Sequence, residues 1–116
     1  MLERGMDDVK APARLRRLPR TVVLGVEVPV AIDRRARLLG LAFLDRSDVG
    51  PGLLIPRCRS VHTFGMRFRL DVFFLDCRGG PIRVERRTPP CRVLASRGAV
   101  AVLELPAGGE VFPARP

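Results

Sequence analysis

The sequence predicts a mainly β protein: a small single-domain β-sandwich or barrel-like fold with one short helix. Three observations favour this class. Short apolar runs recur along the chain, glycines and prolines separate them, and only one stretch carries the end signals of a helix. A chain of 116 residues is long enough for one domain with a single apolar core.

The N-terminal residues show no hydrophobic periodicity and include Pro12, Pro19 and several arginines. We expect residues 1–20 to form a mobile, basic N-terminal arm and residues 21–116 to form one β domain. Acidic side chains are mixed into this arm and it has no apolar segment, so it lacks the pattern of a secretory signal. The sequence therefore favours a cytoplasmic location.

The first predicted strand covers residues 21–28, where the even-numbered residues are apolar and share one face, and Pro29 ends it. A short helix is predicted next, at residues 34–39. Asp33 can accept hydrogen bonds from the free N–H groups at the start of this helix, and Gly40 can adopt the left-handed conformation at its end.

The strongest strand signal lies at residues 70–75, where both faces are apolar except at Asp71. We therefore expect this strand to be central and covered on both sides. A glycine-containing turn leads from it to a half-exposed strand at residues 81–87, with Ile82 and Val84 pointing inward. Further strands are predicted at residues 53–55, 61–64, 92–95 and 100–105.

The net charge is +9, and all but one of the 21 basic residues are arginines. This charge suits nucleic acid or another polyanion as a partner. The arginines are scattered, however, and the chain has no tyrosine or tryptophan on which bases could stack. No apolar run approaches the ~18 residues of a membrane span, so we expect no membrane partner. Protein partners are left open.

The three cysteines, Cys58, Cys77 and Cys91, are widely spaced, and the chain has one histidine, His62. These residues do not have the spacing of a zinc site, so we expect free thiols, no bound metal and no cofactor. The sequence also contains no GxSxG, HExxH, P-loop or GxGxxG motif, so we assign no catalytic residue.

The candidate ligand-binding site is built around residues 60–76, which hold the one histidine and four of the six phenylalanines. A buried charge is costly unless it is paired, so Asp71 needs a partner, which His62 or an arginine could supply. A carboxylate beside a histidine suits acid–base chemistry and equally suits a structural hydrogen-bond network. The candidate residues are polar or soft side chains within or beside apolar runs: His62, Thr63, Met66, Asp71, Glu104 and Arg46.

Three functions are open at this point. The leading interpretation is a non-enzymatic small-ligand-binding or accessory module, in which polar groups at His62, Thr63 and Asp71 are set in an apolar frame. The first alternative is polyanion (RNA or DNA) binding through the arginine-rich surface. The second alternative is a hydrolase-type enzyme that uses His62 with a carboxylate.

One set of motifs carries a family resemblance. Residues 61–76 read VHTFGMRFRLDVFFLD, accompanied by GL at 40–41, DR at 45–46, GLLI at 52–55 and VLELPAG at 102–108. Together these motifs resemble domain-of-unknown-function family 192, over residues 21 to about 109. The resemblance implies a compact β-sandwich-like fold and no particular activity. Arg69 stands where such proteins usually have proline, and few residues follow Gly108, so we expect a shortened or missing last strand.

Overall fold

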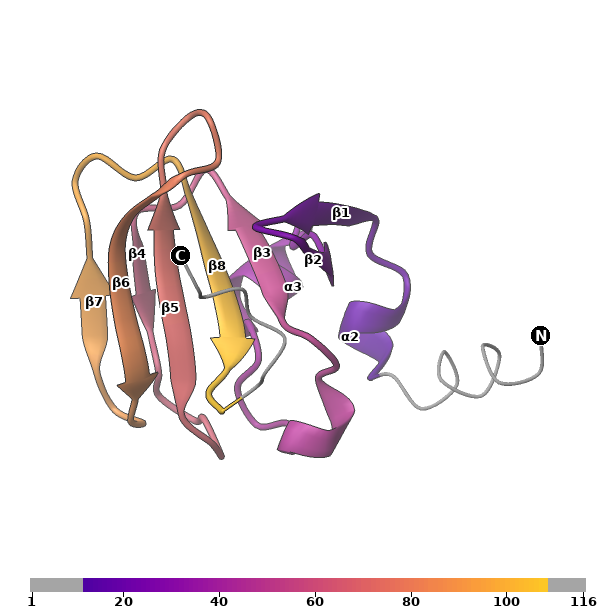
Figure 1. Cartoon of the computed structure of the whole chain (residues 1–116). Helices are drawn as coiled ribbons and strands as arrows, with labels where there is room; N and C mark the ends of the chain where they lie inside the picture. The colour runs from indigo at the N-terminus through magenta and orange to yellow at the C-terminus, as the bar shows by residue number, and fades with distance from the viewer. Residues whose placement is uncertain (1–11, 109–116) are drawn as a thin grey trace.

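The computed structural model describes residues 12–108 (Figure 1). Its centre is a four-stranded antiparallel sheet, and two smaller antiparallel pairs pack on it. In spatial order, the central sheet contains β3 (Leu53–Pro56), β8 (Ala101–Pro106), β5 (Leu70–Leu75) and β6 (Pro81–Thr88). The smaller pairs are β1 (Arg20–Val23) with β2 (Val26–Pro29), and β4 (Ser60–His62) with β7 (Val93–Ala95). The helical segments are α2 (Ala13–Arg16), α3 (Arg34–Leu39) and the 3-10 turn η1 (Arg46–Asp48).

The buried apolar side chains form two layers, one on each face of the central sheet. The first layer joins one face of the sheet to β4, β7 and α3, and includes Ala36, Val61 and Phe74. The second layer joins the opposite face to the β1–β2 pair, and includes Val28 and Phe73. The predicted class, a mainly β single domain, is therefore confirmed, with two short α-helices in the described residues where one was expected.

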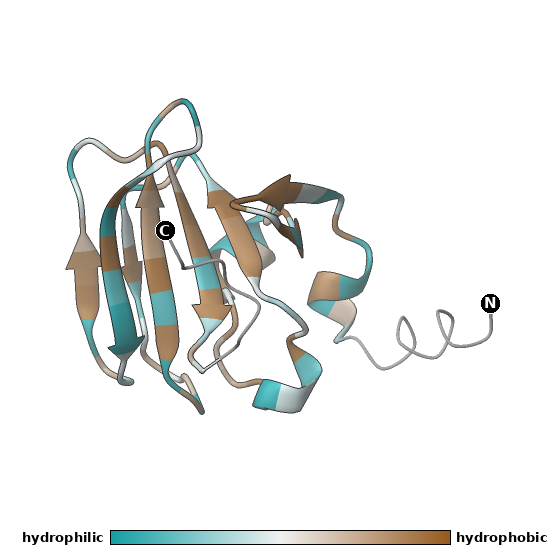
Figure 2. Cartoon of the chain, viewed as in Figure 1, coloured by the Kyte–Doolittle hydropathy of each residue, from teal (hydrophilic) through white to brown (hydrophobic). Residues whose placement is uncertain are grey.

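β5 is the central strand that the sequence predicts. All six of its residues are buried, and it pairs with β8 on one side and β6 on the other. Alternate side chains enter the two layers, with Val72 and Phe74 in the first and Phe73 and Leu75 in the second. Figure 2 shows the brown of apolar residues along β5 and β8, interrupted by a teal band in each strand. Each of these two strands thus carries a polar residue within an apolar frame.

The other strand and helix predictions are confirmed with small shifts. The ends of five strands lie one or two residues from the predicted ones, in β3, β4, β6, β7 and β8. The helix at α3 begins as expected, because the Asp33 carboxylate accepts a hydrogen bond from the Ala36 N–H at 2.7 Å. It ends at Gly40, whose φ is +54°. No helix within residues 12–108 is long and apolar enough to cross a membrane.

The prediction of one strand at residues 21–28 was wrong, because this segment is the β1–β2 hairpin. Leu24 and Gly25 form its turn with φ angles of +49° and +82°. Apolar residues continue at the even-numbered positions through this two-residue turn, so the sequence pattern does not reveal it. The hairpin pairs even with odd positions, which puts Val22 and Val28 on opposite faces. Val22 pairs with Glu27 and is exposed, whereas Val28 lies in the second layer.

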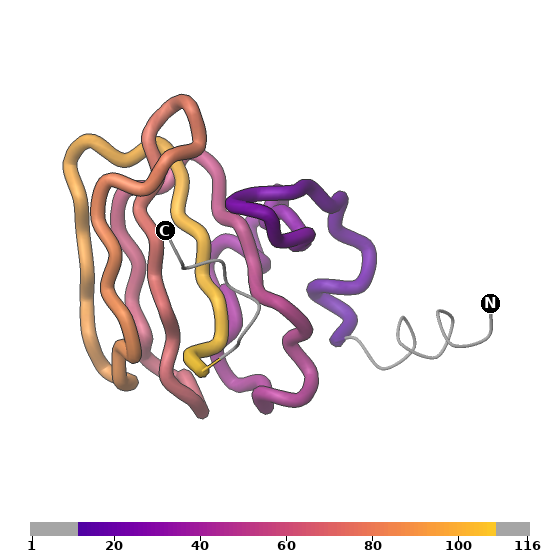
Figure 3. Tube along the Cα trace, in the orientation of Figure 1, coloured from indigo at the N-terminus to yellow at the C-terminus, as the bar shows by residue number. Residues whose placement is uncertain are grey.

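The inward orientation expected for Ile82 and Val84 was also wrong. These side chains of β6 are 47% and 40% exposed. The β1–β2 pair stands at the β3 side of the sheet, away from β6, as Figures 1 and 3 show. The second layer therefore does not reach the β6 end of that face, and its apolar side chains there stay in contact with solvent.

The N-terminal arm expected at residues 1–20 is described in part. Residues 1–11 lie outside the described residues, and so do residues 109–116, where the shortened last strand was expected. Residues 12–20 differ from the expectation, because Leu15 and Leu18 are buried in the first layer. The Arg14 guanidinium also donates hydrogen bonds to the carbonyl oxygens of Gly40 and Ala42. This part of the predicted arm is folded onto the domain.

Candidate functional site

A pocket of about 210 Å³ opens into the first layer between α3, β3, β4 and β8. Glu104 of β8 lines it, because this side chain points to the same face of the sheet as Val102. His62, at the end of β4, and Met66, shortly after it, line the same pocket. Three of the six candidate residues therefore meet in one place.

The Glu104 carboxyl group is the unusual feature of this pocket. Glu104 is only 3% exposed. Its Oε1 atom is buried and has no hydrogen-bond partner among residues 12–108. Burial disfavours the charged form and raises the pKa of Glu104 to about 7. At neutral pH this carboxyl group is therefore divided between its protonated and ionised forms.

Two glycines allow the backbone to close around Glu104. A Cβ atom at Gly52 would lie 2.2 Å from the Glu104 carbonyl oxygen, so only glycine fits where β3 begins to pair with β8. A Cβ atom at Gly40 would lie 3.2 Å from Oε1 of Glu104, and Gly40 has a positive φ. The end of α3 thus comes directly against the carboxyl group and helps to exclude water from it.

His62 stands on the exposed side of the pocket. Its Nδ1 atom accepts a hydrogen bond from the Phe64 N–H at 3.2 Å, and the two rings lie 5.5 Å apart. In the neutral imidazole the proton is then on Nε2, which leaves that nitrogen as a donor for a ligand. Met66 is buried and adds a flexible apolar wall.

Thr63 is close to these residues in sequence but serves the fold. It is fully buried, and its hydroxyl group donates to the Pro89 carbonyl oxygen at 2.7 Å. The same oxygen accepts from the Arg92 N–H at 2.8 Å. The hydroxyl group therefore acts as both donor and acceptor, and these two hydrogen bonds connect the end of β4 to the segment between β6 and β7.

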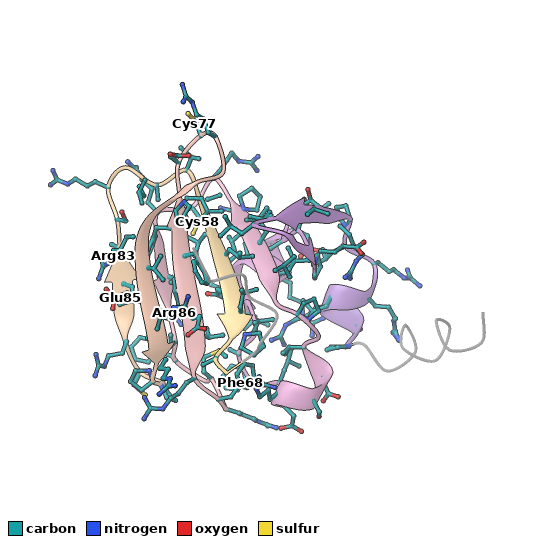
Figure 4. All side chains as sticks on the ribbon, viewed as in Figure 1. Cys58, Phe68, Cys77, Arg83, Glu85 and Arg86 are labelled. Atoms are coloured by element: carbon teal, nitrogen blue, oxygen red, sulfur yellow. The ribbon has the colours of Figure 1, made fainter. Side chains whose placement is uncertain are left out.

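Asp71 lies on the opposite face of the sheet from Glu104. β5 and β8 pair so that Asp71 stands beside Leu105, while Glu104 stands beside Val72. The Asp71 carboxylate accepts from the Arg87 N–H at 2.8 Å and lies 3.4 Å from the Arg86 guanidinium, which Figure 4 labels. The partner that Asp71 required is thus an arginine and a backbone amide of β6, at an irregularity in the β5–β6 register.

Arg46, the last candidate, lies at η1 and donates a hydrogen bond to the Ala107 carbonyl oxygen at 3.1 Å. It is not part of the pocket lining. The structure therefore brings His62, Met66 and Glu104 together and leaves Thr63 and Arg46 in structural hydrogen bonds. Asp71 is separated from the pocket by the thickness of the sheet.

Sequence reasoning missed three polar residues that line the pocket: Arg37, Cys58 and Ser60. The Arg37 guanidinium donates to the carbonyl oxygens of Pro56 and Arg57, which fixes α3 to the turn after β3. Burial raises the pKa of the Cys58 thiol, whose sulfur donates to the Ser60 carbonyl oxygen at 3.1 Å. Nothing in the sequence distinguishes Arg37 from the neighbouring arginines of α3.

The three cysteines are free thiols among the described residues. Within residues 12–108, no three histidine, cysteine or acidic side chains are placed together as ligands for a metal ion. What the pocket offers is a buried carboxyl group, an imidazole at the mouth and apolar walls.

These features define a small mainly β domain with one buried carboxyl group in a pocket. The chain belongs to the family DUF192 (Uncharacterized ACR), whose sequence profile matches residues 18–110. The family resemblance seen in the motifs is thereby confirmed. None of the curated proteins compared with the chain matches it.

Two solved structures show the same fold. One is a protein of unknown function from Novosphingobium aromaticivorans DSM 12444, with a TM-score of 0.59 and 18% identity over 84% of this chain and 86% of that chain. The other, from Sinorhizobium meliloti 1021, is described as "a putative transcription regulator", with a TM-score of 0.57 and 24% identity over 77% of this chain and 78% of that chain. At these identities the likeness concerns the fold alone.

Proposed function

We infer that this domain is a non-enzymatic small-ligand-binding module whose ligand places a hydrogen-bond donor against the Glu104 carboxyl group. The observation that carries this inference is the buried Oε1 atom without a partner among the described residues. Such an atom costs free energy in the free protein, and a ligand that donates to it recovers that cost. This is the leading interpretation from the sequence, except that the central polar group of the proposed binding site is Glu104 instead of Asp71.

The pocket also indicates the size and character of the ligand. Its volume of about 210 Å³ exceeds that of a cavity of ~150 Å³ that holds benzene. Leu41, Ile55 and Val61 give it an apolar wall. The ligand that fits is a small, mostly apolar molecule with one amine or hydroxyl group directed at Glu104, and His62 contacts it at the mouth.

The Met66 methyl group provides a direct measurement, because Met66 lines the pocket. The protein is labelled with ¹³C at the methionine methyl groups, and Met66→Leu assigns the signal. Cyclohexylamine and benzyl alcohol are titrated as probes, with cyclohexanecarboxylate as the negative probe. We expect saturable shifts of the Met66 signal with the amine or the alcohol and none with the carboxylate, because two carboxyl groups offer poor complementarity.

Two variants control this experiment. Glu104→Gln weakens the response to the amine, because it removes the charge that the amine pairs with. Glu85→Gln serves as the matched control, since Glu85 is half-buried at the edge of β6 and pairs with Arg83 (Figure 4). If neither probe shifts the Met66 signal, or if both variants respond alike, the inference is wrong.

A second candidate function is a hydrolase-type enzyme, and one observation favours it. His62 and Glu104 line the same pocket, and a carboxyl pKa of about 7 suits a general acid or base at neutral pH. The test uses chromogenic p-nitrophenyl esters and phosphates. Turnover that is lost in both Glu104→Gln and His62→Ala would support this candidate over the binding module. If the native protein turns over none of these esters and phosphates, the binding module remains the proposed function.

A further inference from the structure

A second hollow, more open than the Glu104 pocket, lies on the surface at the turn after β3. Its volume is about 470 Å³, and Cys58 contributes to the walls of both. Its charged lining consists of Arg57, Arg59 and Arg97, and no acidic side chain among residues 12–108 lines it. Three arginines therefore line one open hollow beside the Glu104 pocket.

The backbone that carries these arginines is held in place on both sides of the hollow. The Cys58 N–H donates to the Val100 carbonyl oxygen at 3.3 Å, and the Ser96 N–H donates to the Arg59 carbonyl oxygen at 2.9 Å. The turn that bears Arg97 is closed by a hydrogen bond of 3.1 Å from the Ala99 N–H to the Ser96 carbonyl oxygen. The arginines thus extend from two turns that are hydrogen-bonded to each other, which lowers the cost of ordering them around a ligand.

Some arginines of the domain have acidic partners, and in the described part of the chain the three arginines of the hollow do not. Arg20, Arg67 and Arg83 form ion pairs with acidic side chains. Within residues 12–108, the guanidinium groups of the three arginines in the hollow have neither an ion pair nor a hydrogen bond. Like charges that converge without a counter-charge repel each other, and an oxyanion between them relieves that repulsion.

We propose that Arg57, Arg59 and Arg97 bind the phosphate group of a small phosphorylated molecule. Guanidinium groups bind phosphate oxygens through pairs of parallel hydrogen bonds, and three of them satisfy one phosphate from several sides. This site does not depend on the Glu104 pocket, so either assignment can fail without the other.

The test measures the affinity for inorganic phosphate by calorimetry at constant ionic strength. The site variant is Arg57→Gln/Arg59→Gln/Arg97→Gln. The matched control is Arg34→Gln/Arg35→Gln/Arg78→Gln, which removes the same charge from exposed positions outside the hollow. We expect saturable binding to the native protein, at least a tenfold loss in the site variant and less than a twofold change in the control. Absence of saturable binding, or equal losses in the two variants, would overturn the proposal.

A single-stranded RNA oligonucleotide distinguishes a phosphate site from a general polyanion surface. Each phosphate that is neutralised on a single strand contributes about −0.7 to the slope of log affinity against log salt. A site for one phosphate group gives a slope of about −0.7 and a loss confined to the site variant. A slope that corresponds to six or more phosphates, lost equally in the control variant, would overturn the proposal in favour of a polyanion surface.

A final measurement separates this site from the proposed ligand pocket. Glu104→Gln retains phosphate affinity within twofold if the arginine site is independent. A larger loss in this variant would contradict the independence of the two sites.

Discussion

Asp71 and Glu104 are two buried carboxyl groups on neighbouring strands, and they face opposite sides of the same sheet. Asp71 accepts a hydrogen bond from the Arg87 N–H and forms an ion pair with Arg86. Glu104 has a buried oxygen without a partner in the described part of the chain. Both residues are almost fully buried, so burial alone does not distinguish them.

The difference between these two residues teaches how to separate a structural carboxylate from a candidate functional one. A buried polar group that has its partners stabilises the fold, as Asp71 does where β6 departs from regular pairing. A buried polar group without them reduces stability, and Glu104 does so beside a pocket large enough for a ligand.

The largest expected effect is the pH dependence of stability that Glu104 causes. Its pKa is raised to about 7 in the folded protein, above the ordinary value of 4.5. The folded state therefore binds a proton more tightly, and stability is lost as pH rises from about 4.5 to about 7. This difference between the folded and the ordinary pKa corresponds to about 3 kcal/mol in the free energy of unfolding.

Glu104→Gln removes this dependence. The variant should gain about 3 kcal/mol relative to the native protein between pH 4 and pH 8, as measured by urea denaturation followed by circular dichroism. Glu85→Gln, at the sheet edge, should show no such gain. A Glu104→Gln difference that stays constant over this pH range would show that the carboxyl group is not perturbed.

Asp71→Ala should destabilise the fold by about 2 kcal/mol, because it leaves the Arg87 N–H without its acceptor. Asp71→Asn keeps an oxygen in that place and should cost about half as much. Urea denaturation at pH 7 measures both. A neutral effect of Asp71→Ala would mean that the hydrogen bonds of this carboxylate do not support the fold, and the comparison with Glu104 would lose its basis.

Thr63→Val should cost about 1.5 kcal/mol, since it removes both hydrogen bonds of a buried hydroxyl at nearly constant volume. Thr88→Val is the matched control. The Thr88 hydroxyl makes a hydrogen bond of 3.4 Å to the Glu85 carbonyl oxygen, so its loss should matter less. Equal costs in the two variants would argue against Thr63 as a specific tie between β4 and the connection to β7.

The smallest effect on stability is expected for His62→Ala. His62 is exposed, and its substitution should change the unfolding free energy by less than about 0.5 kcal/mol. The same variant should weaken the response of Met66 to the amine probe, because His62 lines the pocket mouth. A large loss of stability with unchanged probe binding would assign His62 to the fold instead of the pocket.

The fold could be predicted where the signals are local. Asp33 and Gly40 marked the two ends of α3, and the unbroken apolar run of β5 marked the central strand. The turn at Leu24 and Gly25 escaped notice because apolar residues continue at every second position of the sequence through it.

The candidate site could be predicted only in part, for a different physical reason. The alternation in β5 and in β8 shows which residues of each strand share a face. It does not show which face of one strand joins which face of the other, because this depends on their pairing register. Asp71 and Glu104 were therefore grouped from the sequence, and the pairing of Asp71 with Leu105 separates them. Arg37 and Cys58 reach the pocket through contacts distant in sequence, which no local pattern records.

The most direct test of the account is the titration of the Glu104 side-chain carbonyl carbon by ¹³C nuclear magnetic resonance, with the signal assigned through Glu104→Gln. Arg37, Cys58 and His62 face the same pocket, so the titration is repeated in His62→Ala to separate the imidazole from the carboxyl group. The account predicts a pKa of about 7 in both proteins. A pKa near the ordinary value of 4.5 would contradict it. Glu104 would then be solvated or paired, and the pocket would hold no carboxyl oxygen that lacks a hydrogen-bond partner.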